Sequence, residues 1–208
     1  MERRQILLGS LAAAVSAVPI VGAVAGSARA QSMEIFPDDR ILGSADAPLT
    51  IIEYSSLTCP HCAALHADAL PRIKETWIAD GRARLVFRHY PLDGLALRAA
   101  AVADCIDGDR FFAFLDLLFQ NQQRWARATD PIQALGQVAS LAGIGQSQFE
   151  GCVKDEAKMD KILTRAQDAG ETYKVESTPT LIANGRKIEG ALSFEEFDAI
   201  FAKIAAGS

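Results

Sequence analysis

Two cysteines separated by two residues are the part of this sequence best suited to chemistry. Cys59-Pro60-His61-Cys62 follows an apolar run, Leu49 to Ser56, that is typical of a strand buried on both faces, and it opens a helical pattern. A thiol at the start of a helix faces the positive end of the helix dipole, which favours the thiolate over the thiol. Because the thiolate is the species that attacks a disulfide, this placement predicts redox catalysis.

We expect the two thiols to have different tasks. Cys59, with Pro60 pre-set for the first helical turn, should be ionised and react with substrate, whereas Cys62 lies one turn deeper and should resolve the mixed disulfide. A partly protonated His61 between them would stabilise the Cys59 thiolate and make the disulfide a strong oxidant. The alternatives are a zinc half-site or an inert structural disulfide, with an exposed His61 that has no role.

An acid inside the apolar strand suggests a partner for the second thiol. Glu53 lies six residues before Cys59. A carboxylate buried beneath the thiols could accept the proton that Cys62 loses during exchange, and burial would raise its pKa towards the working range. The alternatives are an edge or solvent-facing position for Glu53, or a pair with Arg88 on the neighbouring strand.

Thr178-Pro179 is the second segment that we expect at the site. It stands immediately before another strand-like run, Thr180 to Ala183. A cis proline there would place the Thr178 backbone beside the dithiol and leave its N–H and C=O free to pair with an extended substrate. The alternative is an ordinary trans proline at the start of a strand.

The remaining cysteines and histidines are interpreted without a metal role. Cys105 and Cys152 lie in helical patterns and lack C-x-x-C spacing, and in an oxidising compartment we expect them to pair with each other. Closing this loop of about 47 residues would stabilise the fold by about 4 kcal/mol, and a second redox relay is the alternative. His66 is interpreted as a helix-surface residue and His89 as a strand-end residue near the site.

The elements that position these residues alternate between strands and helices. Strand-like runs are expected at residues 49–56, 83–90, 180–183 and 186–189. Asn184-Gly185 is a hairpin signal between the last two. Helical patterns cover 60–79, with Pro71 as a kink, and 95 to about 173, and Ser193 to Glu196 reads as a capping box. This order predicts an α/β sheet domain that is interrupted by helices.

Length and charge restrict the class of protein. The chain has 208 residues, of which 50% are hydrophobic, so a full core is possible without disulfides or metal. Lys and Arg number 21 against 26 Asp and Glu, which gives a formal net charge of −5. This acidic balance argues against a general nucleic-acid-binding protein.

The first 30 residues have the pattern of an export signal. Arg3 and Arg4 precede a long uncharged stretch, Gln5 to Ser27, that is rich in Leu, Ala and Val and is followed by Ala28-Arg29-Ala30. This pattern predicts a signal peptide for the Sec or twin-arginine route, cleaved near Ala30/Gln31. An uncleaved membrane anchor is the alternative. Both the Sec and the twin-arginine route lead to a bacterial-type periplasm, where disulfides persist.

Taken together, these residues resemble the DsbA family of periplasmic thiol:disulfide oxidoreductases. The resemblance rests on Glu53-Tyr54 leading to Cys59-Pro60-His61-Cys62, the strand Val86 to Leu92, the helical segment with Cys105 and Cys152, and Thr178-Pro179. It implies a thioredoxin fold with an inserted all-helical domain and a cis Pro179. The expected parts are a signal peptide at 1–30, a thioredoxin-fold domain at 31–94 and 174–208, and the helical domain at 95–173. The second cysteine pair is similar to the variant of the family that carries a second, structural disulfide.

The resemblance also implies a function and partners. It implies an oxidase that donates a Cys59–Cys62 disulfide to unfolded or newly exported proteins with free thiols, and that is reoxidised by a membrane quinone-linked partner of the DsbB type. No organic cofactor or metal is implied, and we expect a monomer that binds no nucleic acid. Three alternatives stay open: a disulfide isomerase or reductase, a metal-binding module that uses Cys59, Cys62 and a His, and a chaperone with an apolar helical surface. Isomerases of this class add a dimerisation domain, for which no segment is spare.

Overall fold

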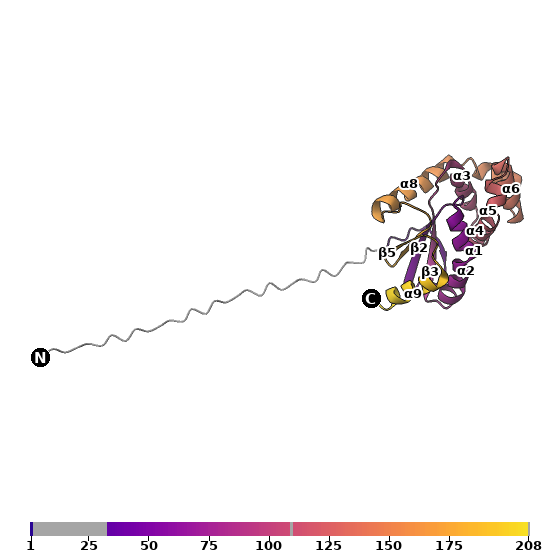
Figure 1. Cartoon of the computed structure of the whole chain (residues 1–208). Coiled ribbons are helices and arrows are strands. Elements are labelled where there is room, and N and C mark those ends of the chain that lie inside the picture. The colour runs from indigo at the N-terminus through magenta and orange to yellow at the C-terminus, as the bar shows by residue number, and fades with distance from the viewer. Residues whose placement is uncertain (2–32, 109, 208) are drawn as a thin grey trace.

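A five-stranded mixed sheet forms the centre of the described chain (Figure 1). The computed structural model describes residues 1, 33–108 and 110–207. Apart from Met1, the predicted signal peptide at 1–30 and its cleavage site near Ala30/Gln31 lie outside the described residues. The strands are β1 (Arg40–Leu42), β2 (Leu49–Ser55), β3 (Ala83–His89), β4 (Thr180–Ala183) and β5 (Arg186–Glu189). Their order is β1-β3-β2-β4-β5, and only the β2–β3 pair is parallel among them.

Strand β2 is central because every one of its side chains is buried. Successive side chains of a strand point to opposite faces, so its apolar residues contribute to two cores. Ile51 packs into the larger core, which also holds residues of α1, α4 and α9, and Ile52 and Tyr54 pack into a smaller core with Ala169 of α8. The continuous apolar run in the sequence therefore reflects helices on both faces of the sheet.

Ten helical segments accompany the sheet in the described part of the chain. They are α1 (Pro60–Ala67), α2 (Ala69–Ile73), η1 (Lys74–Ile78), α3 (Gly94–Ala103), α4 (Arg110–Gln120), α5 (Gln122–Ala126), α6 (Pro131–Leu141), α7 (Gln146–Cys152), α8 (Glu156–Thr172) and α9 (Phe194–Ala205). Helices α3 to α8 all lie between β3 and β4 in the chain (Figure 1). Their assignment to a separate helical domain at 95–173 stays a prediction.

The short-range turn and cap signals form the structures that the sequence predicts. Asn184 and Gly185 both have positive φ, 44° and 86°, and connect β4 to β5. The Ser193 hydroxyl accepts from the Glu196 N–H while the Glu196 carboxylate accepts from the Ser193 N–H, which is the predicted capping box. Asp130 caps α6 and is followed by Pro131 at its first turn.

The long helix expected at 60–79 breaks earlier than predicted. Helix α1 ends at Ala67, and Asp68 adopts φ −107° and ψ −68° before α2 begins. Pro71 explains the position, because it has no N–H for the carbonyl four residues earlier, that of Ala67, and its ring crowds that carbonyl. The kink therefore falls before the proline. Strand β1 was also missed, since three residues at a sheet edge carry too little alternation to be recognised.

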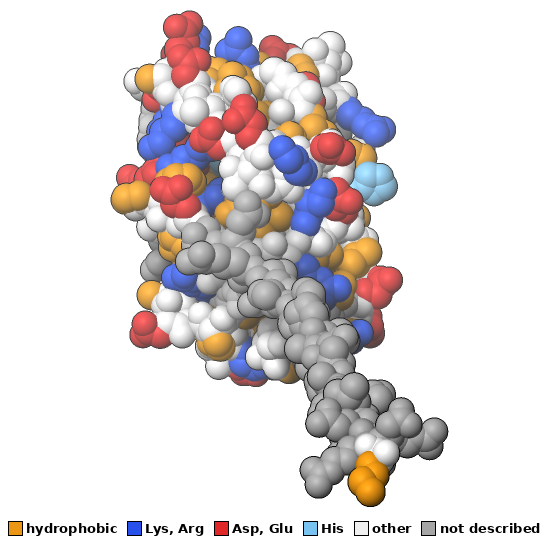
Figure 2. Space-filling model, turned by 90° about the vertical axis from the view of Figure 1, so that its left-hand side faces the viewer, with side chains coloured by type: hydrophobic (Ala, Val, Ile, Leu, Met, Phe, Trp, Pro, Cys, Tyr) orange, Lys and Arg blue, Asp and Glu red, His pale blue; other side chains and the backbone are white. Residues whose placement is uncertain are grey.

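The surface has no single dominant charge on the face in Figure 2. Acidic and basic side chains are interspersed there, with hydrophobic side chains scattered between them. Such mixing is usual for the exterior of a folded domain. None of the helices within the described residues is both long enough and apolar enough to cross a membrane.

Candidate active site

The C-x-x-C pair lies where the central strand gives way to α1. Cys59 is the N-cap residue of α1 with φ −78° and ψ 121°, and Pro60 occupies the first turn. Cys59 is 5% exposed and Cys62 is fully buried, and both thiols are free. The His61 side chain, in contrast, is exposed. The helix start thus presents one thiol near the surface and holds the other beneath it.

Several hydrogen bonds favour the ionised form of Cys59. The Cys62 thiol donates to the Cys59 sulfur and has the largest effect, and burial opposes it. The Thr178 hydroxyl and the backbone N–H groups of Cys62 and His61 add to the effect, so the pKa of Cys59 falls to about 5. Cys59 is therefore a thiolate at neutral pH. His61 contributes through its backbone in this arrangement, and a role for its imidazole stays a prediction.

The Thr178–Pro179 peptide bond is cis and faces the first thiol. When Cys59 is protonated, its thiol donates to the Thr178 carbonyl oxygen at a distance of 3.3 Å. The Thr178 hydroxyl is buried and has no hydrogen-bond partner within the described chain, which leaves it available to the Cys59 thiolate. The antiparallel pairing of Tyr54 with Thr180 brings the start of β4 beside the end of β2, which places this loop against α1.

The second thiol is in the opposite state. Burial raises the pKa of Cys62, and the neighbouring Cys59 raises it further, while a hydrogen bond with the Ser55 hydroxyl acts in the other direction. Cys62 therefore keeps its proton at neutral pH. Any exchange step that uses the Cys62 sulfur needs a group that takes or returns this proton.

Glu53 lies on the same side of β2 as Ser55 and is completely buried. Its Oε1 accepts a hydrogen bond from Ser55 Oγ at 2.5 Å and lies 2.9 Å from Nε2 of His66, while Oε2 has no partner among the described residues. The alternative pair with Arg88 does not form. In the β2–β3 register Glu53 is opposite Phe87, so Arg88 points to the other face of the sheet.

The sequence predicts His66 at the helix surface, and this prediction is wrong. His66 is buried on the inner face of α1, where its ring stacks on Phe119 with centroids 4.0 Å apart and meets the edge of Phe87. The spacing of four residues from Cys62 was the available signal, because i and i+4 share one face of a helix. A polar side chain on an apolar helix face was misread as exposed.

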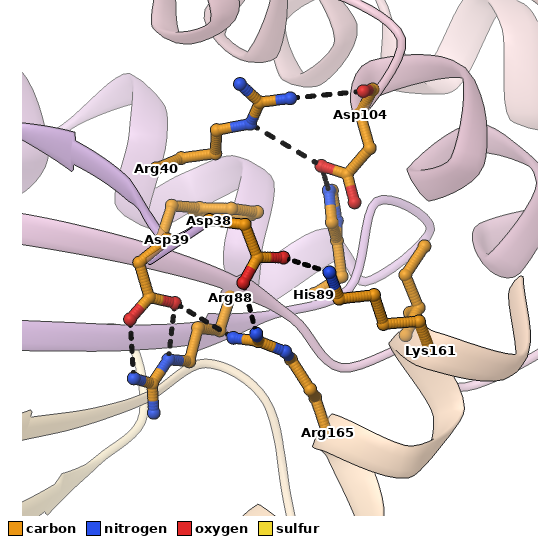
Figure 3. Close-up of a pocket in the computed structure, with 10 residues that line it drawn as sticks. Asp38, Asp39, Arg40, Arg88, His89, Asp104, Lys161 and Arg165 are labelled. Atoms are coloured by element: carbon orange, nitrogen blue, oxygen red, sulfur yellow. Dashed lines mark hydrogen bonds and ion pairs between the residues drawn. The ribbon is translucent and has the colours of Figure 1, made fainter. Parts of the chain in front are cut away.

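His89 ends β3, as predicted, but it faces a different cluster of charges. Its Nε2 lies 3.4 Å from the Asp104 carboxylate, in a cavity of about 50 Å³ (Figure 3). Arg88 enters the same region and forms a buried ion pair with Asp39, 2.7 Å between Nη2 and Oδ2, while Arg165 of α8 contacts Asp39 at 3.2 Å. This cluster attaches the segment before β1 to β3 and α8.

Cys105 and Cys152 form a disulfide within the helical segment. Their Cα atoms are 6.2 Å apart, and the bond connects the chain just after α3 to the last residue of α7. The pair is thus separate in sequence and in bonding from the two free thiols of the C-x-x-C motif.

Gln122 of α5 is a contact that sequence reasoning missed. Its side chain is 2% exposed, and its Nε2 donates to the carbonyl oxygens of Leu57 and Cys59, each at 2.9 Å. A polar residue between apolar helix positions was the only hint, and nothing near it in the chain identifies its acceptors. Through Gln122, the helical segment holds the loop that ends in the reactive thiol.

A surface pocket of about 430 Å³ adjoins this loop. It is lined by Thr58, Pro60, Asp93, Leu95, Gln122, Gln123, Ala126 and Arg127. Polar and apolar side chains therefore both line this pocket, which includes the two sequence neighbours of Cys59, Thr58 and Pro60. Among the described residues, no group of three or more His, Cys, Asp or Glu side chains is placed to hold a metal ion.

Known proteins share this fold. The family model described as Thioredoxin matches residues 36–203. The crystal structure of Wolbachia pipientis alpha-DsbA1 is 29% identical with a TM-score of 0.78, covering 86% of this chain and 96% of that one. The structure of oxidised BdbD from Bacillus subtilis, at 22% identity and a TM-score of 0.70, covers 81% of this chain and 94% of its own, and shows a likeness of fold.

Two curated relatives show the extent of the sequence similarity. A Rickettsia bellii protein, whose name refers to a protein-disulfide oxidoreductase, is 26% identical over 159 residues and 76% of this chain. The chain spans 61%, 59% and 58% of the length of this protein and two other Rickettsia relatives. Disulfide bond formation protein D of Bacillus subtilis is 25% identical over 167 residues, which cover 75% of this chain and 72% of that protein.

Proposed function

The chain belongs to the thioredoxin family, among its DsbA-like members, and we propose that it is a protein thiol:disulfide oxidoreductase that donates the Cys59–Cys62 disulfide to substrate proteins. The observation that carries this proposal is the opposite behaviour of the two thiols. The pKa of Cys59 falls to about 5, whereas that of the buried Cys62 is raised. One sulfur is thus prepared to attack and to leave, and the other to stay protonated after the disulfide opens.

The exchange would proceed in two displacements. A substrate thiolate attacks the Cys59 sulfur of the oxidised enzyme, the Cys59–Cys62 bond breaks, and Cys62 leaves with the electron pair and takes up a proton. A second substrate thiolate then attacks the substrate sulfur of the mixed disulfide, and Cys59 leaves as a thiolate. The substrate is oxidised by two electrons and the enzyme dithiol is reduced by two. A stabilised thiolate makes Cys59 a good leaving group and favours the reduced enzyme, which supports the oxidase direction.

The neighbouring residues would support these steps in distinct ways. Thr178 and Pro179 would hold an extended substrate beside Cys59, since the Thr178 carbonyl already lies within hydrogen-bonding distance of its sulfur. Glu53 would exchange the proton of Cys62 through Ser55, to which both are hydrogen-bonded. Pro60 would keep the first turn of α1 rigid, and His61, at the exposed end of the motif, would add charge near the thiolate.

We also propose the compartment and partners that the sequence implies. Residues 1–30 would export the protein by the Sec or twin-arginine route to the periplasm, where unfolded or newly exported proteins with free thiols would be its substrates. A membrane quinone-linked protein of the DsbB type would reoxidise it, and the working unit would be a monomer. No metal or organic cofactor enters the reaction as written.

One experiment tests the activity and its direction. The oxidised protein is mixed with a dithiol peptide and the peptide disulfide is followed, with Cys59→Ser as the matched variant; equilibration in glutathione buffers then gives the reduction potential. Rapid peptide oxidation by the wild type alone, with a potential well above that of thioredoxin at about −270 mV, is the expected result. A potential as low as that of thioredoxin would support a reductase, and equal behaviour of wild type and variant would reject thiol exchange altogether.

A further inference from the structure

A line of polar groups runs from the buried second thiol towards the protein surface. Cys62 is hydrogen-bonded to the Ser55 hydroxyl, which donates to Glu53 Oε1. The same carboxylate oxygen lies 2.9 Å from His66 Nε2, and the other ring nitrogen of His66, Nδ1, lies 3.4 Å from Asp116 Oδ1. The Asp116 side chain is 33% exposed, so the line ends in contact with solvent.

The position of His66 is unusual because both its ring nitrogens face carboxylates while its ring is buried. The side chain is 2% exposed and is held in place by Phe119 on one side and Phe87 on the other. A neutral imidazole can donate to only one of the two carboxylates, whereas the imidazolium satisfies both. An imidazole between two acceptors can also receive a proton at one nitrogen and release another from the second.

Small side chains of α1 border a surface pocket beside this histidine. A surface pocket of about 260 Å³ lies between α1 and α4 and is lined by Ala63, Ala64, Ala67, Phe119 and Gln120, with His66 in its wall. Larger residues at the alanine positions of α1 would close this pocket. The pocket adjoins the part of α1 that carries Cys62, because Ala63 in its lining follows that residue directly.

We propose that His66 is the residue that passes the proton of Cys62 between Glu53 and the surface at Asp116. The inference rests on the proposed thiol exchange and extends it. His66 contacts neither sulfur and acts on Cys62 only through Glu53 and Ser55. It is therefore a positioning residue, which controls where the proton goes, and not a catalytic residue.

The proton balance follows the direction of the reaction. When Cys62 attacks a mixed disulfide at Cys59, the Cys62 proton passes to Ser55 Oγ as the Ser55 proton passes to Glu53 Oε1. The Nε2 of a neutral His66 ring, whose own proton is on Nδ1, then takes the proton from Glu53. The new disulfide forms, the substrate thiolate leaves with the electron pair of the broken bond, and His66 releases a proton from Nδ1 towards Asp116. When a substrate thiolate opens the enzyme disulfide, the same sites work in reverse and Cys62 is protonated.

The charges around His66 fit this use. Burial alone would lower the pKa of His66, but Glu53 of β2 and Asp116 of α4 outweigh it and raise the pKa. Lys74 of η1 binds Asp116 at 2.7 Å, and with His66 it holds the pKa of Asp116 below its usual range. The β3 side chain that packs against the His66 ring is Phe87, which carries no charge. The two carboxylates thus favour the protonated ring, and the neutral ring, with its proton on Nδ1, is the form that takes a proton from Glu53.

The test separates the two thiols within one measurement. Reduced enzyme is mixed with excess 5,5′-dithiobis(2-nitrobenzoate), and two thionitrobenzoate anions are released in sequence. The first release reports attack by Cys59, and the second reports attack by Cys62 on the mixed disulfide. We compare the wild type with His66→Gln, whose amide can still bond Glu53 but cannot carry a proton, over a range of pH.

We expect His66→Gln to leave the first release unchanged and to slow the second by about ten- to a hundredfold, because general acid–base groups contribute effects of this size or larger. The wild-type second release should rise with pH as His66 loses its proton, and this inflection should be absent in the variant. Asp116→Asn should slow the second release as well. Phe119→Leu, which removes the stacking ring but no polar contact, should keep the wild-type pH dependence.

Each outcome decides the matter. A second release in His66→Gln with the wild-type rate and pH profile would overturn the proton route while leaving thiol exchange intact. Equal slowing in His66→Gln and Phe119→Leu, without loss of the inflection, would show that His66 serves packing alone. If wild-type enzyme releases thionitrobenzoate no faster than a free thiol in either phase, the proposed function itself fails. Should His66→Gln not fold, the Asp116→Asn profile decides between the same outcomes.

Discussion

The Gln122 side chain donates a hydrogen bond to the carbonyl oxygen of Cys59, although 63 residues separate the two in sequence. The same amide nitrogen donates to the Leu57 carbonyl, so one buried side chain fixes two backbone positions in the loop before α1. The helical segment between β3 and β4 therefore holds the reactive thiol in place directly. A change in the packing of α5 would therefore move the backbone that carries Cys59.

Replacing Gln122 tests this connection. Gln122→Leu leaves the Leu57 carbonyl without its donor and should lower the free energy of unfolding by about 1–3 kcal/mol, the cost of an unsatisfied buried polar group. The loop should also loosen, which would raise the midpoint of Cys59 alkylation. Urea denaturation and alkylation against pH measure the two effects. Gln123→Leu, at an exposed neighbouring position, is the control and should change neither.

The ionisation of Cys59 predicts a pH-dependent reactivity. Alkylation by iodoacetamide should show a midpoint near pH 5, because the Cys62 thiol, the Thr178 hydroxyl and two backbone N–H groups stabilise the thiolate. A midpoint near that of an ordinary thiol, about 8.5, would contradict the arrangement described. Cys62→Ala, which removes that thiol and leaves no other donor in its place, should raise the midpoint, since the largest single contribution comes from the Cys62 thiol.

The same ionisation should appear in stability. The pKa of Cys59 is lower in the folded than in the unfolded protein, so reduced enzyme gains stability that is fully present above about pH 8.5 and lost as the pH falls through about 5. The oxidised enzyme has no thiol to ionise at Cys59. The free energy of unfolding of the reduced form, relative to that of the oxidised form, should therefore decrease as the pH is lowered from about 8.5 to about 5. Urea unfolding of both forms measures this difference. A difference independent of pH would be the contrary result.

Removing the second disulfide separates a structural role from a redox role. The Cys105→Ala/Cys152→Ala variant should lose about 4 kcal/mol of unfolding free energy, on the chain-entropy estimate for a loop of this length. If the pair is structural, the variant should still oxidise a dithiol peptide at the wild-type rate below its unfolding temperature. A large loss of rate in a variant that remains folded would favour the alternative of a redox relay.

The buried ion pair between Asp39, in the segment before β1, and Arg88 of β3 can be tested by its effect on stability. Asp39 is 1% exposed and pairs with Arg88, so Asp39→Asn leaves a buried guanidinium uncompensated and should destabilise the protein by about 3–5 kcal/mol. Asp38 binds Lys161 and Arg165 at the surface with 48% exposure, and Asp38→Asn should cost less than about 1 kcal/mol. Thermal unfolding compares the two variants. Equal losses of stability in the two variants would show that burial does not determine how much each ion pair contributes to the free energy of unfolding.

The features decided by the sequence alone are those whose cause lies within a few neighbouring residues. A buried strand followed by Cys59 and Pro60 dictates a thiol at a helix start, whatever the rest of the chain does. Asn184-Gly185 and the Ser193 capping box are equally local, because positive φ and a three-residue hydrogen bond need no distant partner.

The tertiary structure decided which distant polar groups meet. Whether Glu53 faces Arg88 or His66 depends on the register of β2 with β3 and on the face that α1 presents, and neither can be read from short-range periodicity. Gln122 became part of the site only because α5 packs over the loop before α1. Strand pairing and helix packing choose partners across the whole chain, and the proton environment of Cys62 follows from those choices.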